Sequence, residues 1–147
     1  MRPWPTALPL VAILRGIQPH EAIAHCEVLV DAGFDAIEIP LNSPEWPASI
    51  RAVAARFGAQ ALIGGGTVLN ATQADSLLAC GGKLMVTPNT RPALIEHAVA
   101  KGLFVAAGFA TASEAFDAID AGAQALKLFP ATTYGTGHVK ALRAVLP

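Results

Sequence analysis

Residues 35–68 read DAIEIPLNSPEWPASIRAVAARFGAQALIGGGTV, and this stretch decides the fold. Residues 35–41 and 61–68 are short apolar runs bounded by turn residues, which is typical of strands buried on both faces of a parallel sheet. Between them, residues 44–58 carry apolar side chains at helical spacing. The stretch therefore predicts a strand, a helix and a second strand parallel to the first.

The same unit recurs along the whole chain. The predicted strands are residues 8–15, 35–41, 61–68, 83–88, 103–109 and 125–130, and the predicted helices are residues 19–33, 44–58, 70–82, 91–102, 111–122 and 137–146. Five helical segments end in glycines that we expect to adopt the left-handed conformation, at positions 33, 58, 81 or 82, 102 and 122. Helix openers stand at Pro19, Ser43–Pro44 and Asn70, and at Thr111 with Glu114 at capping-box spacing. Six β-α units with right-handed crossovers follow from this pattern.

Two architectures use such units, the open doubly wound sheet and the closed (β/α)8 barrel. The glycines at 64–66 end a strand, but they lack the spacing and the downstream acid of a dinucleotide-binding loop. Polar residues follow several strands, where barrel active sites are built, so the barrel is favoured. The sequence thus predicts an α/β protein of the TIM barrel family with about six of its eight units. We expect residues 1–147 to form a single, incomplete barrel domain.

Composition excludes several classes of protein. The 147 residues are 53% hydrophobic and carry a formal net charge of −1. Disorder and a dedicated nucleic-acid binder are therefore excluded. No apolar run reaches the roughly 20 residues of a membrane span. Cys26 and Cys80 fit helical apolar patterns as free thiols, and the four histidines share no metal-ligand spacing, so we expect a cytoplasmic protein without a metal or another cofactor.

Two charged residues are enclosed within apolar strands. In residues 125–130, ALKLFP, Lys127 lies on the face opposite to its leucine neighbours, and Glu38 alternates in the same way with two isoleucines. A desolvated lysine favours the neutral amine, which condenses with carbonyls, and a buried carboxyl suits acid/base work. The alternatives are a lysine that reaches solvent and a glutamate in a structural ion pair. The opposite signs of the two residues favour a Schiff-base lysine with an acid/base partner.

Further polar residues follow the predicted strands and are candidates for substrate binding. Arg15 could fork onto a carboxylate or phosphate, and Thr67, after the glycines that permit close approach, could bond a carboxylate. A surface arginine and a turn threonine are the alternatives. Asn42 and Pro88 also lie at strand ends, and the neighbouring Ser43, Thr87 and Asn89 are further candidates for lining the mouth of the site.

Six segments of the chain resemble the sequence motifs of one family, and they occur in the same order as in that family. The chain is similar to the 2-keto-3-deoxy-6-phosphogluconate and 6-phosphogalactonate aldolases, which are class I lyases. The matching segments are VAILRG at 11–16, EIPLNS at 38–43, GGGTV at 64–68, VTPN at 86–89, TASEA at 111–115 and ALKLFP at 125–130.

The resemblance implies a role for each candidate. Lys127 would form the Schiff base, Glu38 would move the protons, and Arg15 and Thr67 would contact the substrate. The substrate would be a phosphorylated 2-keto-3-deoxy sugar acid, cleaved to pyruvate and glyceraldehyde 3-phosphate by a homotrimer. Asn42 resembles the galactonate branch, whereas the gluconate branch tends to carry arginine there.

The resemblance also leaves alternatives open. Family members continue with two more strands whose loops hold the substrate phosphate, and this sequence lacks them. The gluconate epimer as substrate, a non-catalytic remnant and another phosphate-binding barrel such as an isomerase are therefore retained as alternatives.

Overall fold

The computed structural model describes residues 4–147 as six strands that alternate strictly with six helices. The strands are β1 (Ala12–Ile13), β2 (Ala36–Pro40), β3 (Leu62–Gly66), β4 (Leu84–Val86), β5 (Phe104–Phe109) and β6 (Ala125–Leu128). The helices are α1 (Pro19–Asp31), α2 (Trp46–Phe57), α3 (Ala71–Ala79), α4 (Pro92–Ala100), α5 (Ala112–Asp120) and α6 (Ala131–Leu142). The predicted β-α alternation is confirmed.

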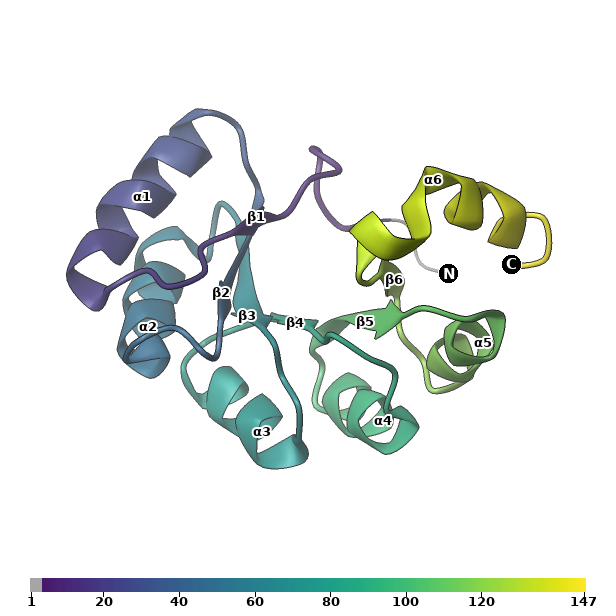
Figure 1. Cartoon of the computed structure of the whole chain (residues 1–147). Coiled ribbons are helices and arrows are strands. Elements are labelled where there is room, and N and C mark those ends of the chain that lie inside the picture. The colour runs from purple at the N-terminus through teal and green to yellow at the C-terminus, as the bar shows by residue number, and fades with distance from the viewer. Residues whose placement is uncertain (1–3) are drawn as a thin grey trace.

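The strands form one parallel sheet in the order β1-β2-β3-β4-β5-β6. The sheet curves into a half-barrel, and α1 to α5 lie around its outer side (Figure 1). Strands that are consecutive in sequence are therefore neighbours in the sheet. In a parallel sheet built this way the carboxyl ends of all strands, and the loops that follow them, lie at one end.

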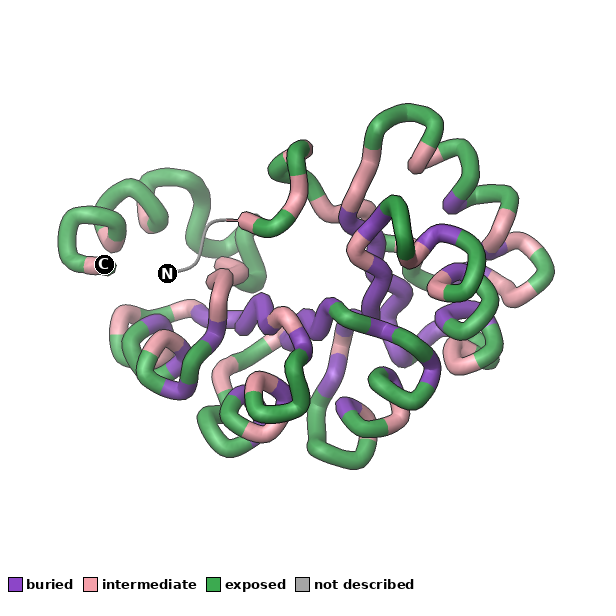
Figure 2. Tube along the Cα trace, turned by 180° about the vertical axis from the view of Figure 1, so that it is seen from behind, coloured by how far each residue is buried: buried purple, intermediate pink, exposed green. Residues whose placement is uncertain are grey.

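The two faces of the curved sheet differ in their packing. The outer face carries Ile37, Ile39, Ile63 and Met85, which pack in the main hydrophobic core with the helices. Fully burying one such side chain stabilises the fold by about 1.5–3 kcal/mol. The inner face carries a much smaller cluster of three buried residues, namely Leu84, Val86 and Ala106. Figure 2 shows that buried segments follow the strands, whereas α6 is largely exposed.

Helix termini largely follow the predicted caps. The Asn70 side chain accepts a hydrogen bond from the Gln73 N–H at 2.9 Å, and Thr111 and Glu114 form the predicted capping box. Four of the predicted left-handed glycines have φ values of +91°, +86°, +85° and +92°, at positions 33, 81, 102 and 122. The prediction for Gly58 is wrong, because its φ is −64° and its N–H donates to the Ala54 carbonyl as another helical residue would.

The first and last predicted elements also differ from the structure. The predicted strand 8–15 is reduced to Ala12–Ile13, and the chain before it is held by the Asp35 carboxylate, which accepts from the Ala7 N–H at 2.6 Å. The last helix begins at Ala131, well before the predicted residue 137, and is interrupted at Gly135 with φ +70° and ψ 175°. Within residues 4–147, no helix is long and apolar enough to cross a membrane.

Candidate active site

Glu38 and Lys127 lie on the inner face of the half-barrel. Glu38 on β2 pairs with Gly64 of β3, and Lys127 on β6 pairs with Gly108 of β5. Their strand neighbours Ile37 and Leu126 pack in the core of the outer face, so alternation directs the two charged side chains inward. Both side chains line one cavity of about 300 Å³.

The cavity is otherwise apolar. Its other lining residues include Val11, Ile13, Val86 and Ala106. Among residues 4–147, Glu38 and Lys127 are the only charged residues in its wall. Trp4 lines it too, and its ring is perpendicular to that of Phe104 at a centroid distance of 5.5 Å. This volume is at the lower end of the roughly 300–1,000 Å³ of small-molecule pockets. Apolar walls strengthen electrostatic interactions between the two charged groups and a ligand.

The Glu38 carboxyl is buried without a partner. The residue is 2% exposed, and within residues 4–147 its Oε2 has no hydrogen-bond partner and it forms no ion pair, which does not support the structural ion-pair alternative. Burial raises the pKa of Glu38, and the positive charges of Lys127 and Arg15 oppose part of that rise. A carboxyl with a raised pKa holds its proton to higher pH than an ordinary carboxyl and is a stronger base once ionised, which suits acid/base work.

Gly66 makes room for this carboxyl. A Cβ at Gly66 would overlap Oε2 of Glu38, and the three atoms nearest to it would all belong to the Glu38 carboxyl group. We expected the glycines at 64–66 to admit a substrate. At Gly66 the space is taken by the Glu38 side chain instead, and no local sequence pattern indicates this long-range contact.

The Lys127 amine is half-buried beside an aromatic ring. Its Nζ lies 5.1 Å from the ring centroid of Phe129, which is 44% exposed. Such a contact holds an ammonium group over the ring face. Sequence reasoning missed Phe129, although the two-residue period of a strand places residues 127 and 129 on one side.

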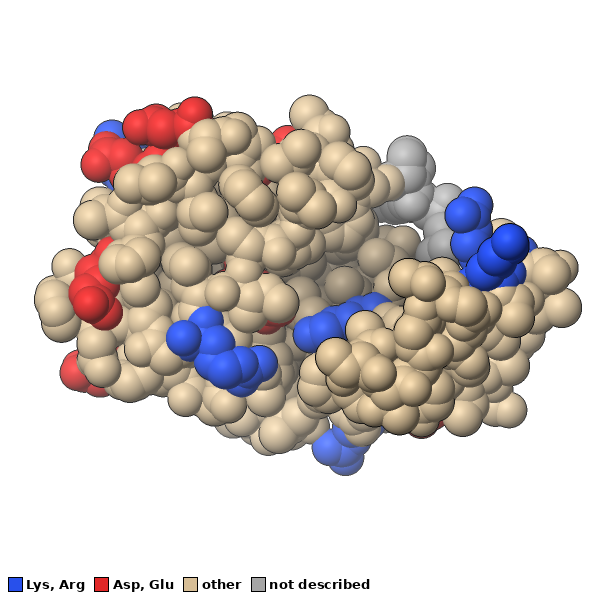
Figure 3. All heavy atoms as spheres, turned by 45° about the horizontal axis from the view of Figure 1, so that its top comes forward, with Lys and Arg blue, Asp and Glu red and all other residues tan. Residues whose placement is uncertain are grey.

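Arg15 and Asn42 meet at the ends of neighbouring strands. The Arg15 Nη1 donates to Asn42 Oδ1 at 2.7 Å, and both side chains are exposed. The Gly16 N–H donates to the Ser43 hydroxyl at 2.9 Å and joins the same two loops. The prediction that Ser43 lines the mouth is wrong, because its buried hydroxyl holds this loop contact. On the face shown in Figure 3, Lys and Arg atoms lie at the central hollow, and Asp and Glu atoms are seen chiefly toward the edge.

Thr67 and Pro88 follow strands β3 and β4. Thr67 has φ +57°, a left-handed conformation that is a marked outlier for a β-branched residue. Such strain of about 1–3 kcal/mol concentrates at functional sites. Thr87 is 1% exposed with its hydroxyl bonded to neighbouring main chain, so the prediction that it lines the mouth is wrong. The four predicted substrate-binding residues, Arg15, Asn42, Thr67 and Pro88, follow strand ends and are not part of the wall of the 300 Å³ cavity.

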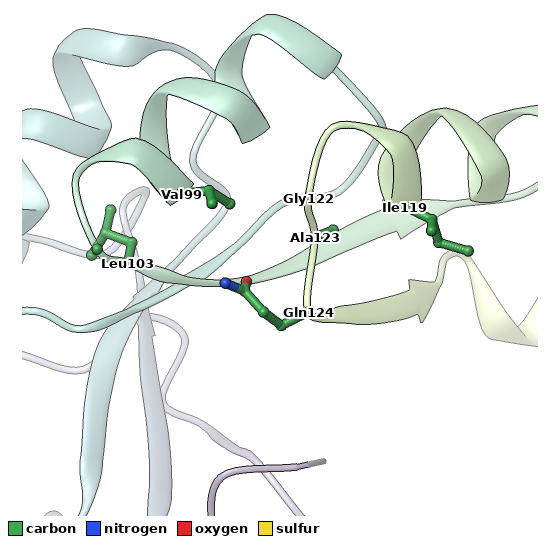
Figure 4. Close-up of a pocket in the computed structure, with 7 residues that line it drawn as sticks. Val99, Leu103, Ile119, Gly122, Ala123 and Gln124 are labelled. Carbon is green, nitrogen blue, oxygen red and sulfur yellow. The ribbon is translucent and has the colours of Figure 1, made fainter. Parts of the chain in front are cut away.

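Other parts of the molecule offer less chemistry. A cavity of about 410 Å³ between α4 and α5 is lined by Val99, Gly102, Leu103, Ile119, Gly122, Ala123 and Gln124, none of them titratable (Figure 4). In the part of the chain that the structure describes, no three His, Cys, Asp or Glu residues gather as metal ligands. Burial raises the pKa of the Cys26 thiol to about 11, which leaves it unreactive.

Comparison with known proteins agrees with this geometry. The sequence model of the KDPG and KHG aldolase family matches residues 5–147. The 2-dehydro-3-deoxy-6-phosphogalactonate aldolase of Escherichia coli K12 is 56% identical over 98% of this chain and 70% of its own length. A probable aldolase of the same name from Rhizobium meliloti is 48% identical over 97% of the chain and 68% of its own length. A solved structure described as native KDPGal superposes with a TM-score of 0.96 at 56% identity, covering 98% of this chain and 70% of that one. The chain therefore belongs to the KDPG and KHG aldolase family.

Proposed function

We propose that the protein is a Schiff-base aldolase that cleaves 2-dehydro-3-deoxy-6-phospho-D-galactonate to pyruvate and D-glyceraldehyde 3-phosphate. The observation that carries this proposal is that Lys127 and Glu38 lie together in the wall of one apolar cavity. An amine and a carboxyl in the wall of one small cavity are the two groups that a metal-independent retro-aldol reaction needs.

The first half of the reaction forms the covalent intermediate. The neutral Lys127 amine attacks the C2 ketone and gives a carbinolamine. The carbinolamine takes up a proton and loses water to give an iminium ion. Glu38 then accepts the proton of the C4 hydroxyl, and the electrons of the C3–C4 bond move into the iminium. Glyceraldehyde 3-phosphate leaves, and an enamine of pyruvate remains on Lys127.

The second half returns the enzyme to its starting state. Glu38, now protonated, donates its proton to C3 of the enamine, and the resulting iminium is hydrolysed by water to pyruvate and the free amine. One carboxyl thus acts first as base and then as acid. A pKa raised by burial suits both steps, because it brings the proton affinity of Glu38 closer to that of the groups it serves.

We propose that Arg15 and Thr67 bind the anionic groups of the substrate, with Asn42 and Pro88 beside them. Arg15 supplies a guanidinium at the end of β1, and Thr67 supplies a hydroxyl on the strained turn after β3. Asn42 favours the galactonate epimer over the gluconate epimer. An arginine at position 42 would repel the Arg15 guanidinium that the Asn42 amide oxygen now accepts from at 2.7 Å.

We further propose that the half-barrel corresponds to six units of a (β/α)8 barrel, and that residues 1–147 belong to one domain of it. The strand order and the helices on the outer side support this reading. A homotrimer in the cytoplasm is proposed on the family resemblance. Sedimentation equilibrium of the purified protein tests the trimer, and a monomer mass at micromolar concentration would refute it.

Borohydride trapping with pyruvate tests the function. We expect a stable adduct of one pyruvate on the wild-type chain, mapped by peptide mass spectrometry to Lys127. Lys127→Met should give no adduct. Lys140→Met, which changes a lysine on the exposed helix α6, is the matched control and should trap pyruvate like the wild type.

The rates of cleavage of the two C4 epimers then test the substrate. We expect faster cleavage of the galactonate epimer, and Asn42→Arg should reduce that preference. A folded wild-type chain that forms no adduct, alongside a trapped E. coli relative, would refute the aldolase proposal and support a non-catalytic remnant. Adduct formation with faster cleavage of the gluconate epimer would overturn only the substrate assignment.

A further inference from the structure

Two threonine hydroxyls form the hydrogen bonds to Gly108 of β5 that main-chain groups of β4 would form if that strand were longer. Strand β4 ends at Val86, whereas β5 continues to Phe109. The Gly108 N–H donates to the Thr87 hydroxyl at 3.1 Å, and the Gly108 carbonyl accepts from the Thr90 hydroxyl at 2.7 Å. The side chains of Thr87 and Thr90 thus satisfy both polar groups of Gly108 where the β4 ladder has ended.

Thr87 also closes the turn that carries Pro88. Its hydroxyl donates to the Asn89 carbonyl at 2.7 Å while it accepts from Gly108, so its single proton and one of its lone pairs are both in use. The turn packs directly on β5. A Cβ at Gly108 would overlap Pro88 and Asn89 main-chain atoms, so only glycine permits this approach.

The other edge of Gly108 faces the reactive lysine strand. Gly108 is the register partner of Lys127, and the flanking pairs join β5 to β6 on both sides of it. Gly108 therefore lies between the Thr87 hydroxyl, to which its N–H donates, and its register partner Lys127 on β6. The same hydroxyl fixes the turn at Pro88.

We propose that Thr87 is a positioning residue of the site, which sets the placement of Lys127 and of Pro88 through Gly108 and Asn89. This inference rests on the proposed aldolase function. It assigns Thr87 no contact with the substrate. An amine must approach the carbonyl carbon along a narrow range of directions, and a misplacement of about 1 Å can reduce a rate by about a hundredfold.

The test compares Thr87→Val, which keeps the shape and removes the hydroxyl, with Thr87→Ser, which keeps the hydroxyl. Thr72→Val, on the exposed surface of α3, is the matched control. The two threonine hydroxyls on Gly108, from Thr87 and Thr90, are called the clamp. Hydrogen exchange of the Gly108 amide measures whether the clamp holds, and the rate of borohydride-trapped adduct formation at Lys127 measures its effect on the lysine. Each variant is assayed at the same interval below its own melting temperature, so that a general loss of stability does not enter the comparison.

We expect Thr87→Val to exchange the Gly108 amide at least about tenfold faster and to form the adduct about tenfold to a hundredfold more slowly at saturating pyruvate. Thr87→Ser and Thr72→Val should match the wild type in both. Unchanged Gly108 exchange in Thr87→Val, or lost protection with adduct formation within about twofold of wild type, would overturn the proposal. Where Thr87→Val does not fold, Thr90→Val removes the other half of the clamp and is judged by the same criteria.

The two proposals fail in different ways. A wild-type chain that forms no adduct refutes the aldolase function. The exchange comparison, which needs no pyruvate, still decides whether the Thr87 hydroxyl holds Gly108.

Discussion

Replacing Gly66 with alanine should disturb the molecule through one contact, that with Glu38. The added Cβ would overlap Oε2, and all three of its nearest atoms would belong to the Glu38 carboxyl. The carboxyl has little room to retreat, because Glu38 is 2% exposed and its strand is paired on both sides, with Ile13 and Gly64. The cost of Gly66→Ala should therefore depend on the side chain at position 38.

The magnitude follows from two opposing effects. Overpacking a buried site costs about 1–3 kcal/mol. Because the φ of Gly66 does not lie in the left-handed region, alanine should also restrict the unfolded chain and return about 0.4–1 kcal/mol. In the Glu38→Ala background the overlapping atoms are gone, and only the stabilising effect of Gly66→Ala should remain. The coupling between the two substitutions should therefore be about 1–3 kcal/mol.

Urea unfolding of the wild type, both single variants and the double variant measures this coupling. Gly64→Ala is the matched control, because the three atoms nearest to its Cβ would all belong to Leu84, so its cost should be set by Leu84 and should be similar in both backgrounds. In the Glu38 background, Gly66→Ala should also slow cleavage of the substrate, since the carboxyl that is proposed to accept the C4 hydroxyl proton is displaced. Additivity of Gly66→Ala and Glu38→Ala within about 0.5 kcal/mol would refute the reasoning.

Three further outcomes follow from single groups. Burial raises the pKa of Glu38, so the stability that its protonated carboxyl contributes is present below the ordinary pKa of 4.5 and is lost as pH rises through the raised pKa. Glu38→Gln, which stays neutral, should therefore melt at a higher temperature than the wild type in mild alkali and at the same temperature in acid. The hydrogen bond from His97 lowers the pKa of Asp75, so the stability that Asp75→Asn removes should be present at neutral pH, vanish as pH falls through the lowered pKa, and shrink in high salt. Thr111→Ala removes the side-chain cap of α5 and should cost about 1 kcal/mol in urea unfolding, whereas an unchanged midpoint would show that the Glu114 half of the box suffices.

Most of the fold could be predicted because its signals are local. Short apolar runs, helical spacing and caps such as Asn70 and Thr111 each depend on a few consecutive residues. The period of two within a strand was enough to predict that the Lys127 and Glu38 side chains point inward. Gly58 failed as a prediction because a glycine after a helix can take either hand, and the main-chain bond to Ala54 decides which.

The support of the site could not be predicted because it depends on register between strands. That Gly66 lies beside Glu38 and that Thr87 reaches Gly108 follow from the alignment of β2 with β3 and of β4 with β5. A single sequence does not give this alignment. Thr87 and Ser43 were therefore predicted to line the mouth of the site. In the structure the Thr87 hydroxyl donates to the Asn89 carbonyl, and the Ser43 hydroxyl accepts from the Gly16 N–H.

The three consecutive glycines show how a buried carboxyl constrains the strand beside it. A Cβ at Gly64 would overlap the Leu84 main chain, one at Gly65 would crowd Leu41 and Leu77, and one at Gly66 would overlap Glu38. A side chain is therefore excluded at each of the three positions by a different neighbour, and Glu38 is the neighbour at only one of them. Glycine weakens a strand, since it loses the most conformational freedom on folding and packs no side chain. Glycine at position 66 thus lowers the stability of the strand but leaves space for the Glu38 carboxyl. This position should therefore tolerate a side chain only in variants that lack Glu38, and with it the proton transfer that Glu38 is proposed to perform.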